Sequence, residues 1–270
     1  MATVQTLTLQ TERMQASVED GIGWMVFNNP ARHNALSLEM WEGIGDILEH
    51  FADNEDVRVV IMRGAGGKAF VSGADISEFD KERANAEQRE SYGITAGRAT
   101  QWLAKIEKPL IGLIEGYCIG GGLATALSAD VRFATPDSRF GIPAAKLGLG
   151  YEYEGLAKLA RLVGPSRARD IMFTARFMPA REAVERGLIN FIEERDDIEG
   201  ACVSYAKTIA ANAPLTVKAA KAAINTWERG SRTEEVNAVR AMVDACFDSE
   251  DYREGRKAFA AKRKPEFKNR

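Results

Sequence analysis

Four side chains that can move protons or donate hydrogen bonds crowd one short stretch of this sequence. Residues 148–155 read GLGYEYEG, and the glycines flank Tyr151, Glu152, Tyr153 and Glu154. A carboxylate can act as a general acid or base, and a tyrosine hydroxyl can donate a hydrogen bond. The stretch is therefore a candidate for facing a substrate, and a solvated turn is the alternative.

Histidine and cysteine offer little material for other chemistry. His33 and His50 are the only histidines, too few for a multi-histidine metal site. Cys118, Cys202 and Cys246 are far apart and lack the paired spacing of a zinc site or disulfide framework. We therefore expect these cysteines to pack in the core and expect no metal, which leaves acid–base chemistry to carboxylates and tyrosines.

Two glycine-rich segments could hold an anion with their backbone amides. They read KAFVSGADISEF at residues 68–79 and CIGGGLATA at residues 118–126. Glycine lets the backbone approach a ligand closely, and free N–H groups at a helix start attract negative charge. Two such amides directed at one oxygen would form an oxyanion hole. Taken singly, each segment is better explained as a tight turn, because a lone glycine cluster is a weak signal.

The elements that must position these segments alternate between strand and helix. Ser37 is expected to cap a helix whose apolar residues Met40, Ile44, Leu48 and Phe51 follow the 3.6-residue period. Strands are expected at residues 18–28, 56–63, 109–118, 130–135 and 138–143, and a second helix at residues 86–107. From about residue 200 the pattern is almost purely helical and rich in alanine. The sequence predicts a mixed α/β core with a helical appendage.

Composition excludes several classes of function. The 36 Lys and Arg residues against 39 Asp and Glu give a net charge of -3, which is unlike a general nucleic-acid-binding protein. No run approaches the roughly 18–20 apolar residues of a membrane span, and the first residues do not resemble a signal peptide. We expect a cytoplasmic protein that binds neither nucleic acid nor membrane.

Three segments in order resemble the signatures of the enoyl-CoA hydratase/isomerase, or crotonase, superfamily. They are NPARHNALS at residues 29–37, AFVSGADI at 69–76 and GYCIGGGLATALSADVRFATPDSRFGIP at 116–143. The resemblance implies a spiral of repeated ββα units over residues 1–199 and a helical trimerisation region over residues 200–270. It also implies a homotrimer or homohexamer that acts on an acyl-CoA thioester. Coenzyme A would be part of the substrate, with no separate cofactor.

The resemblance also assigns site residues. Ala74 and Gly121 match the two positions whose amides form the oxyanion hole of the family. Arg32 and Ala35 match positions that line coenzyme A. Phe259 and Lys262 match C-terminal positions that reach coenzyme A, in some members from a neighbouring subunit.

This sequence departs from the hydratases of the superfamily at their two catalytic glutamates. Those positions hold Ala124 and Ala144, and alanine cannot move a proton. Glu152, eight residues after Ala144, resembles the position of a catalytic aspartate in other branches, and Tyr151 resembles a tyrosine of the decarboxylase branch. We expect both in the acyl pocket.

The neighbouring residues are expected to be structural. Glu154 would favour the start of the next helix, and Tyr153 would pack.

Three functions remain open. The first is an acyl-CoA isomerase, atypical hydratase or lyase, or hydrolase in which Glu152 transfers a proton or activates water. The second is a malonyl-type acyl-CoA decarboxylase, which needs little base. The third, from another class, is a non-catalytic acyl-CoA-binding protein, because a fold alone does not fix a function.

Overall fold

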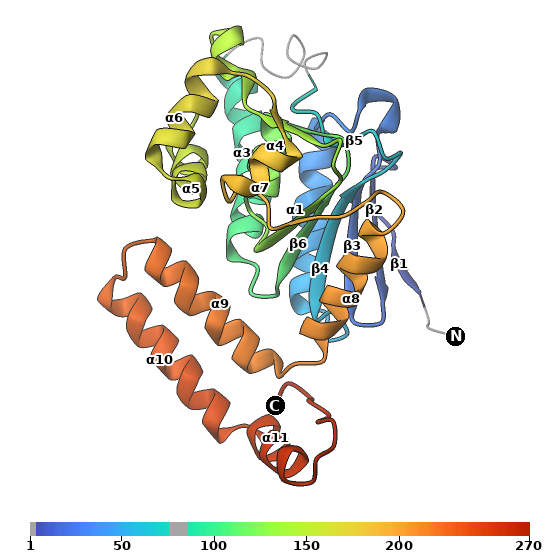
Figure 1. Cartoon of the computed structure of the whole chain (residues 1–270), viewed down its shortest axis with the longest axis vertical. Helices are drawn as coiled ribbons and strands as arrows, with labels where there is room; N and C mark the ends of the chain where they lie inside the picture. Colours follow the sequence, from blue (N-terminus) through green and yellow to red (C-terminus); the bar gives the residue numbers. More distant parts are fainter. Residues whose placement is uncertain (1–3, 76–85) are drawn as a thin grey trace.

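The computed structural model describes residues 4–75 and 86–270, so residues 76–79, which end the KAFVSGADISEF segment, lie outside it. Within these residues the strands form a seven-stranded sheet, in the order β1-β2-β3-β4-β6-β8-β11, and a four-stranded sheet, in the order β10-β9-β7-β5 (Figure 1). The strands are β1 (Gln5–Leu7), β2 (Met14–Glu19), β3 (Ile22–Phe27), β4 (Val59–Gly64), β5 (Ala69–Val71), β6 (Leu110–Ile114), β7 (Tyr117–Ile119), β8 (Val131–Ala134), β9 (Arg139–Gly141), β10 (Met178–Pro179) and β11 (Phe191–Ile192).

Helices separate most of the strands and then dominate the C-terminal part. The described helices are η1 (Pro30–Arg32), α1 (Leu38–Asp53), α3 (Ala86–Lys105), α4 (Gly121–Ala126), η3 (Pro143–Leu147), α5 (Tyr153–Val163), α6 (Pro165–Thr174), α7 (Ala180–Glu185), α8 (Ile198–Ala210), α9 (Pro214–Glu228), α10 (Thr233–Asp248) and α11 (Glu250–Ala260). The predicted mixed α/β class is confirmed.

Helix α1 begins and packs as its sequence predicts. The Ser37 hydroxyl accepts a hydrogen bond from the Met40 backbone N–H and so caps the helix. Met40, Ile44, Leu48 and Phe51 are fully buried on one face. The 3.6-residue period therefore places α1 against the sheet.

The central parallel strands are covered on both faces. One face of the larger sheet packs with α1, α3 and the smaller sheet, and the other packs with Ile198, Cys202 and Ala206 of α8. Parallel strands buried on both faces read as continuous apolar runs, as VVIM in β4 and LIGLI in β6 do. Cys118 and Cys202 are fully buried, as expected for core packing, whereas Cys246 is only partly buried. Burial raises the pKa of the Cys118 thiol and raises that of Cys202 to about 12.

Two predicted strands divide in the structure. Residues 18–28 cross a tight turn at Asp20 and Gly21, with φ of 51° and 80°, so that β2 and β3 pair antiparallel. Residues 109–118 break at Glu115 and Gly116, which carries the chain from the larger sheet into the smaller one. The two predicted strands that follow do not pair with each other, because β8 lies in the larger sheet and β9 in the smaller.

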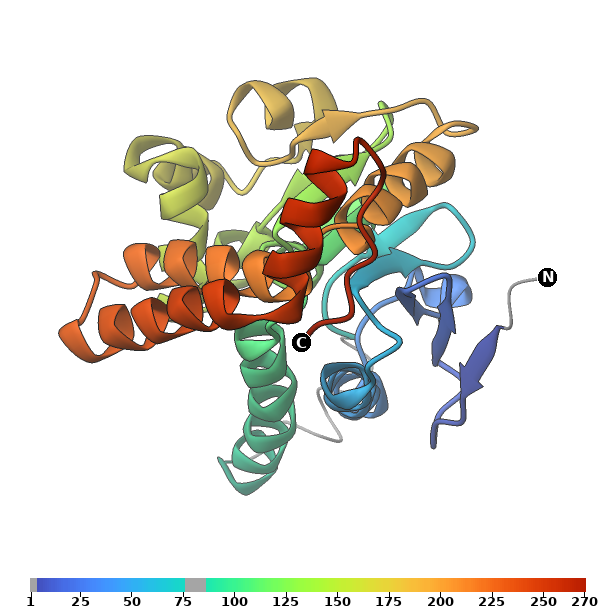
Figure 2. The same ribbon diagram turned by 90° about the horizontal axis from the view of Figure 1, so that it is seen from below.

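The last three helices stand apart from the sheets. Helices α9 and α10 lie side by side below the core, and α11 follows with the C-terminal segment beside it (Figures 1 and 2). The chain forms helices α8 to α11 from Ile198 onward, and α8, which spans the expected boundary near residue 200, packs on the sheet. None of the helices in the described ranges is long and apolar enough to cross a membrane.

Candidate active site

The two glycine-rich segments meet at the carboxyl ends of β5 and β7. A Cβ added to Gly121 would lie 3.8 Å from the backbone nitrogen of Ala74. Among the described residues, neither the Ala74 N–H nor the Gly121 N–H donates a hydrogen bond. Two unpaired donors from separate loops therefore lie close together, in the arrangement that stabilises a negatively charged oxygen.

The backbone around these donors requires glycine at two positions. Gly120 has φ 55° and ψ −119°, a conformation that residues with a side chain rarely adopt. A Cβ on Gly122 would lie only 2.1 Å from the Val71 carbonyl oxygen, so α4 packs directly against β5. The GGG run thus both shapes the turn and brings the two loops into contact.

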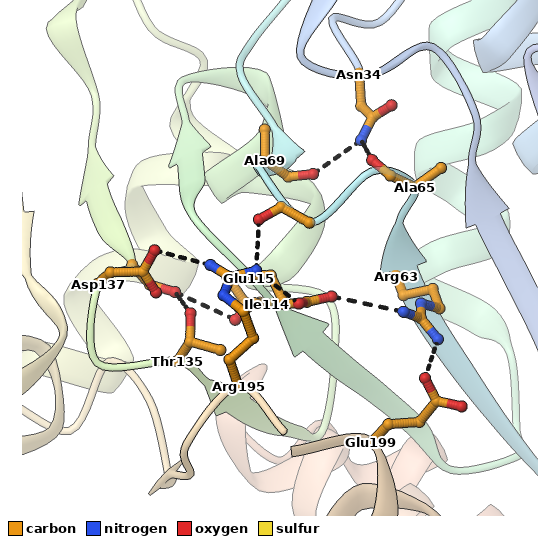
Figure 3. Close-up of polar contacts among 12 residues, drawn as sticks. Asn34, Arg63, Ala65, Ala69, Ile114, Glu115, Thr135, Asp137, Arg195 and Glu199 are labelled. Carbon is orange, nitrogen blue, oxygen red and sulfur yellow. Dashed lines mark hydrogen bonds and ion pairs between the residues drawn. The ribbon is translucent and has the colours of Figure 1, made fainter. Parts of the chain in front are cut away.

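A polar frame holds the loop between β4 and β5, which leads to Ala74. The Asn34 amide nitrogen donates to the carbonyl oxygens of Ala65 and Ala69, at 3.0 and 2.8 Å (Figure 3). Asn34 is fully buried, and its φ of 56° lies in the left-handed region that asparagine tolerates. This side chain therefore joins the NPARHNALS segment, which holds the candidate coenzyme A residues Arg32 and Ala35, to the start of β5.

A second part of the frame comes from more distant residues. Arg195 donates to the Gly67 carbonyl oxygen at 2.7 Å and pairs with the nearly buried Glu115 carboxylate at 2.9 Å (Figure 3). Arg63 approaches the other oxygen of Glu115 at 3.5 Å. The end of β6 and the segment before α8 are thereby tied to the same glycine loop.

Replacing Asn34 with aspartate is expected to lower the free energy of unfolding by roughly 3 kcal/mol. The new carboxylate would face two carbonyl oxygens in a buried site, where the amide now donates to both. Denaturant unfolding measures the change, and Asn54→Asp is the control because its side chain only accepts, from the Asp56 N–H. Equal stability of Asn34→Asp and wild type would show that this contact does not hold the loop.

The GLGYEYEG stretch ends beside the GGG loop. The Tyr151 hydroxyl donates to the Gly120 carbonyl oxygen at 3.2 Å, and its half-buried ring packs against the core. Burial raises the pKa of Tyr151 to about 12, so the hydroxyl keeps its proton near neutral pH. Tyr151 is therefore brought to the loop that carries Gly121.

Glu152 occupies the N-cap position of α5, but its side chain makes no capping hydrogen bond. It is exposed, and in residues 4–75 and 86–270 its carboxylate has no hydrogen-bond or ion-pair partner. Glu154 lies in the first turn of α5, as expected for a carboxylate that favours a helix start. The expectation that Tyr153 packs is wrong within this chain, since the side chain is 76% exposed.

The two alanines at the hydratase glutamate positions lie on short helices. Ala124 lies in α4, three residues after Gly121, and Ala144 lies in η3 and is 4% exposed. Neither side chain can exchange a proton. Any proton transfer at this site must therefore use another group.

The residues expected to contact coenzyme A fall into two groups. Arg32 ends η1, and Ala35 follows it in the loop that leads to α1. Arg32 is exposed and makes no ion pair among the described residues. Phe259 lies in α11 and Lys262 follows its end. Figure 1 shows α11 at the opposite end of the molecule from β5. One chain does not bring these two groups together.

Sequence reasoning missed the residues that support the donors. Asn34, Glu115 and Arg195 hold the loop before β5, but Glu115 and Arg195 are 80 residues apart and no local pattern links them. Asn34 offered only a weak signal in the sequence, because asparagine is common in turns. The structure shows that it forms a left-handed pair with His33, which has a φ of 50°. No cluster of potential metal ligands occurs in the described part of the chain.

Comparison with known proteins gives consistent matches over nearly the full chain. A family model described as enoyl-CoA hydratase/isomerase matches residues 17–270. A short-chain-enoyl-CoA hydratase of Clostridium acetobutylicum is 36% identical, covering 93% of this chain and 96% of that protein. A crotonyl-CoA hydratase of Syntrophomonas wolfei is 32% identical, covering 92% and 95%.

Solved structures show the same fold. The crystal structure of an enoyl-CoA hydratase/carnithine racemase from Magnetospirillum magneticum superposes with a TM-score of 0.90 at 38% identity, covering 97% of each chain. The layered α/β arrangement described above is therefore the crotonase fold.

Proposed function

Because this chain belongs to the enoyl-CoA hydratase/isomerase family, we propose that it transforms an acyl-CoA thioester whose carbonyl oxygen binds between the amides of Ala74 and Gly121. The observation that carries the proposal is a pair of N–H groups on adjoining loops that have no acceptor in residues 4–75 and 86–270. Such donors stabilise the negative charge of an enolate or a tetrahedral intermediate. Each donor is typically worth about 2.7–4 kcal/mol of transition-state stabilisation.

Glu152 supplies the proton transfer or activates water in this proposal. Its carboxylate has no partner among the residues that the structure describes, and Tyr151, the preceding residue, contacts the carbonyl next to Gly121. Ala124 and Ala144 cannot serve. The reaction class is therefore isomerisation, atypical hydration or its reverse, or hydrolysis, without the usual pair of hydratase glutamates.

Decarboxylation of a malonyl-type thioester is the second candidate. It is favoured by the two alanines, because loss of carbon dioxide forms the enolate directly and needs no base to remove a proton. The oxyanion donors would then supply most of the transition-state stabilisation, and Glu152 would contribute little.

A screen of acyl-CoA esters by mass spectrometry tests both candidates. Gain of water, free coenzyme A, or solvent deuterium in an acyl group that has kept all its carbon atoms would support a Glu152-dependent reaction. Release of carbon dioxide would support decarboxylation, and its product would also carry solvent deuterium, because the enolate takes up a proton. Binding of every ester with no product from any of them would contradict both candidates and favour the non-catalytic alternative.

Coenzyme A binding is proposed to use Arg32 and Ala35 of one protomer and Phe259 and Lys262 of a neighbour. Arg32→Ala and Lys262→Ala should each weaken binding of coenzyme A, and the loss should shrink as salt rises from about 0.05 to 0.5 M, because exposed charges are screened. Isothermal titration calorimetry measures the effect. A loss that does not depend on salt would assign these side chains to packing.

We propose that the C-terminal helices pack against those of neighbouring protomers to form a homotrimer or a homohexamer. An apolar groove of about 660 Å³ runs between α9, α10 and α11. Phe247 and Phe259 line it, although they are 60% and 88% exposed. Apolar surface of this kind typically marks a protein–protein interface. In this proposal the neighbouring protomer supplies Phe259 and Lys262 to the loop that carries Arg32 and Ala35.

Light scattering should therefore give a trimer or hexamer at micromolar concentration, and Phe247→Asp should give monomers by placing a charge in the apolar contact. Phe173→Asp is the control, because Phe173 in α6 is 77% exposed and lies outside the groove. Monomeric wild-type protein would contradict both the assembly and the intersubunit placement of Lys262.

A further inference from the structure

We infer that Tyr151 is a positioning residue that orients and strengthens the Gly121 oxyanion donor through the opposite side of the same peptide group. The Tyr151 hydroxyl donates to the carbonyl oxygen of Gly120. That carbonyl and the N–H of Gly121 belong to one planar peptide unit. A hydrogen bond at one end therefore fixes the direction in which the other end points.

The peptide unit needs such support because its surroundings are irregular. Gly120 has φ 55° and ψ −119°, which belongs neither to the preceding strand β7 nor to helix α4. The Gly120 carbonyl also accepts the Ala124 N–H at 3.0 Å, the first hydrogen bond of α4. With Tyr151 the carbonyl has two donors. Hydrogen bonds in such chains polarise one another, so the Gly121 N–H becomes a stronger donor.

The other oxyanion donor has an equivalent arrangement made from backbone alone. The carbonyl of Gly73, in the same peptide unit as the Ala74 N–H, accepts the Leu36 N–H at 2.8 Å. In both peptide units, the carbonyl oxygen opposite the donor N–H accepts a hydrogen bond. Among the described residues, a side chain supports the Gly121 unit alone, so that support can be removed by a conservative side-chain substitution.

The position of Tyr151 is itself fixed. Its ring packs against the core, and Gly155 leaves room for it, since a Cβ there would lie 3.1 Å from the ring. Burial holds the pKa of Tyr151 at about 12, so the hydroxyl remains a donor over the whole range in which the enzyme is assayed. Because Glu152 is the next residue, the same contact also anchors the backbone that carries its carboxylate.

This inference rests on the proposed oxyanion hole, and its test separates the two. The probe is acetyl-CoA labelled with ¹³C at the thioester carbonyl, studied by infrared difference spectroscopy in the presence of wild type, Tyr151→Phe and Tyr153→Phe. Binding to wild type should shift the carbonyl stretch to lower frequency. The shift should be smaller in Tyr151→Phe and unchanged in Tyr153→Phe, whose side chain is exposed.

Turnover provides the second readout. With the substrate that the ester screen identifies, kcat of Tyr151→Phe should fall about 10-fold, equivalent to one hydrogen bond of about 1.4 kcal/mol. Calorimetric affinity for free coenzyme A should not change. Gly155→Ala, which presses on the ring but keeps the hydroxyl, should give an intermediate carbonyl shift.

The outcomes are distinct. No carbonyl shift in wild type would overturn the oxyanion hole and the role of Tyr151 with it. A wild-type shift that Tyr151→Phe fully retains would overturn the positioning role alone. A reduced shift with unchanged affinity for coenzyme A supports it, since a merely structural role would not alter the carbonyl frequency selectively.

Discussion

Replacing Gly121 with proline is expected to lower turnover by roughly 10²- to 10³-fold, the typical cost of losing one oxyanion donor. Proline has no N–H, and its ring would occupy the place of that hydrogen. It is nevertheless tolerated at the first position of a helix, which Gly121 occupies in α4. Steady-state kinetics on the substrate identified by the ester screen measures the loss, and circular dichroism checks the fold.

Gly121→Ala is the matched control because alanine keeps the N–H. Its Cβ would lie 3.8 Å from both the Ala74 nitrogen and a methyl group of Leu36, which is ordinary van der Waals contact. It should retain far more activity than the proline variant. If the proline variant folds and turns over substrate at the wild-type rate, the Gly121 amide is not an oxyanion donor.

Replacing Glu152 with glutamine is expected to lower turnover by roughly 10²-fold or more while affinity for coenzyme A stays close to wild type. Glutamine preserves the size of the side chain but removes its basicity. The fold should not change, because the carboxylate makes no capping bond at the start of α5. Turnover and ligand affinity are measured separately, by kinetics and calorimetry.

Glu154→Gln controls for nearby charge, because Glu154 lies two residues later in the same exposed stretch. It should change stability slightly, through the helix start, and turnover little. Full activity of Glu152→Gln, together with a severe loss in Gly121→Pro, would refute the carboxylate mechanism. Decarboxylation through a stabilised enolate would then explain the chemistry better.

Local patterns predicted the elements that local physics determines. The cap at Ser37 and the apolar stripe of α1 depend on residues within a few positions of each other, and both appear as expected. The Ala-rich region after residue 200 likewise forms α8 to α11. The resemblance to a family identified Ala74 and Gly121 as a pair, and the structure brings them together.

Contacts between distant residues could not be predicted in the same way. Residues 109–118 read as one apolar strand, but Gly116 has a φ of 67° and carries the chain into the second sheet. Tyr151 and Gly120 are 31 residues apart. The sequence placed Tyr151 near the site but could not show that its partner would be a backbone carbonyl. Tertiary packing, rather than local propensity, decides both features.

A crystal structure of the protein with bound acetyl-CoA tests the central claim most directly. We expect the thioester oxygen to lie about 2.7–3.1 Å from the backbone nitrogens of both Ala74 and Gly121, with the Glu152 carboxylate directed at the acyl group. A complex in which this oxygen contacts neither nitrogen would contradict the proposed oxyanion hole.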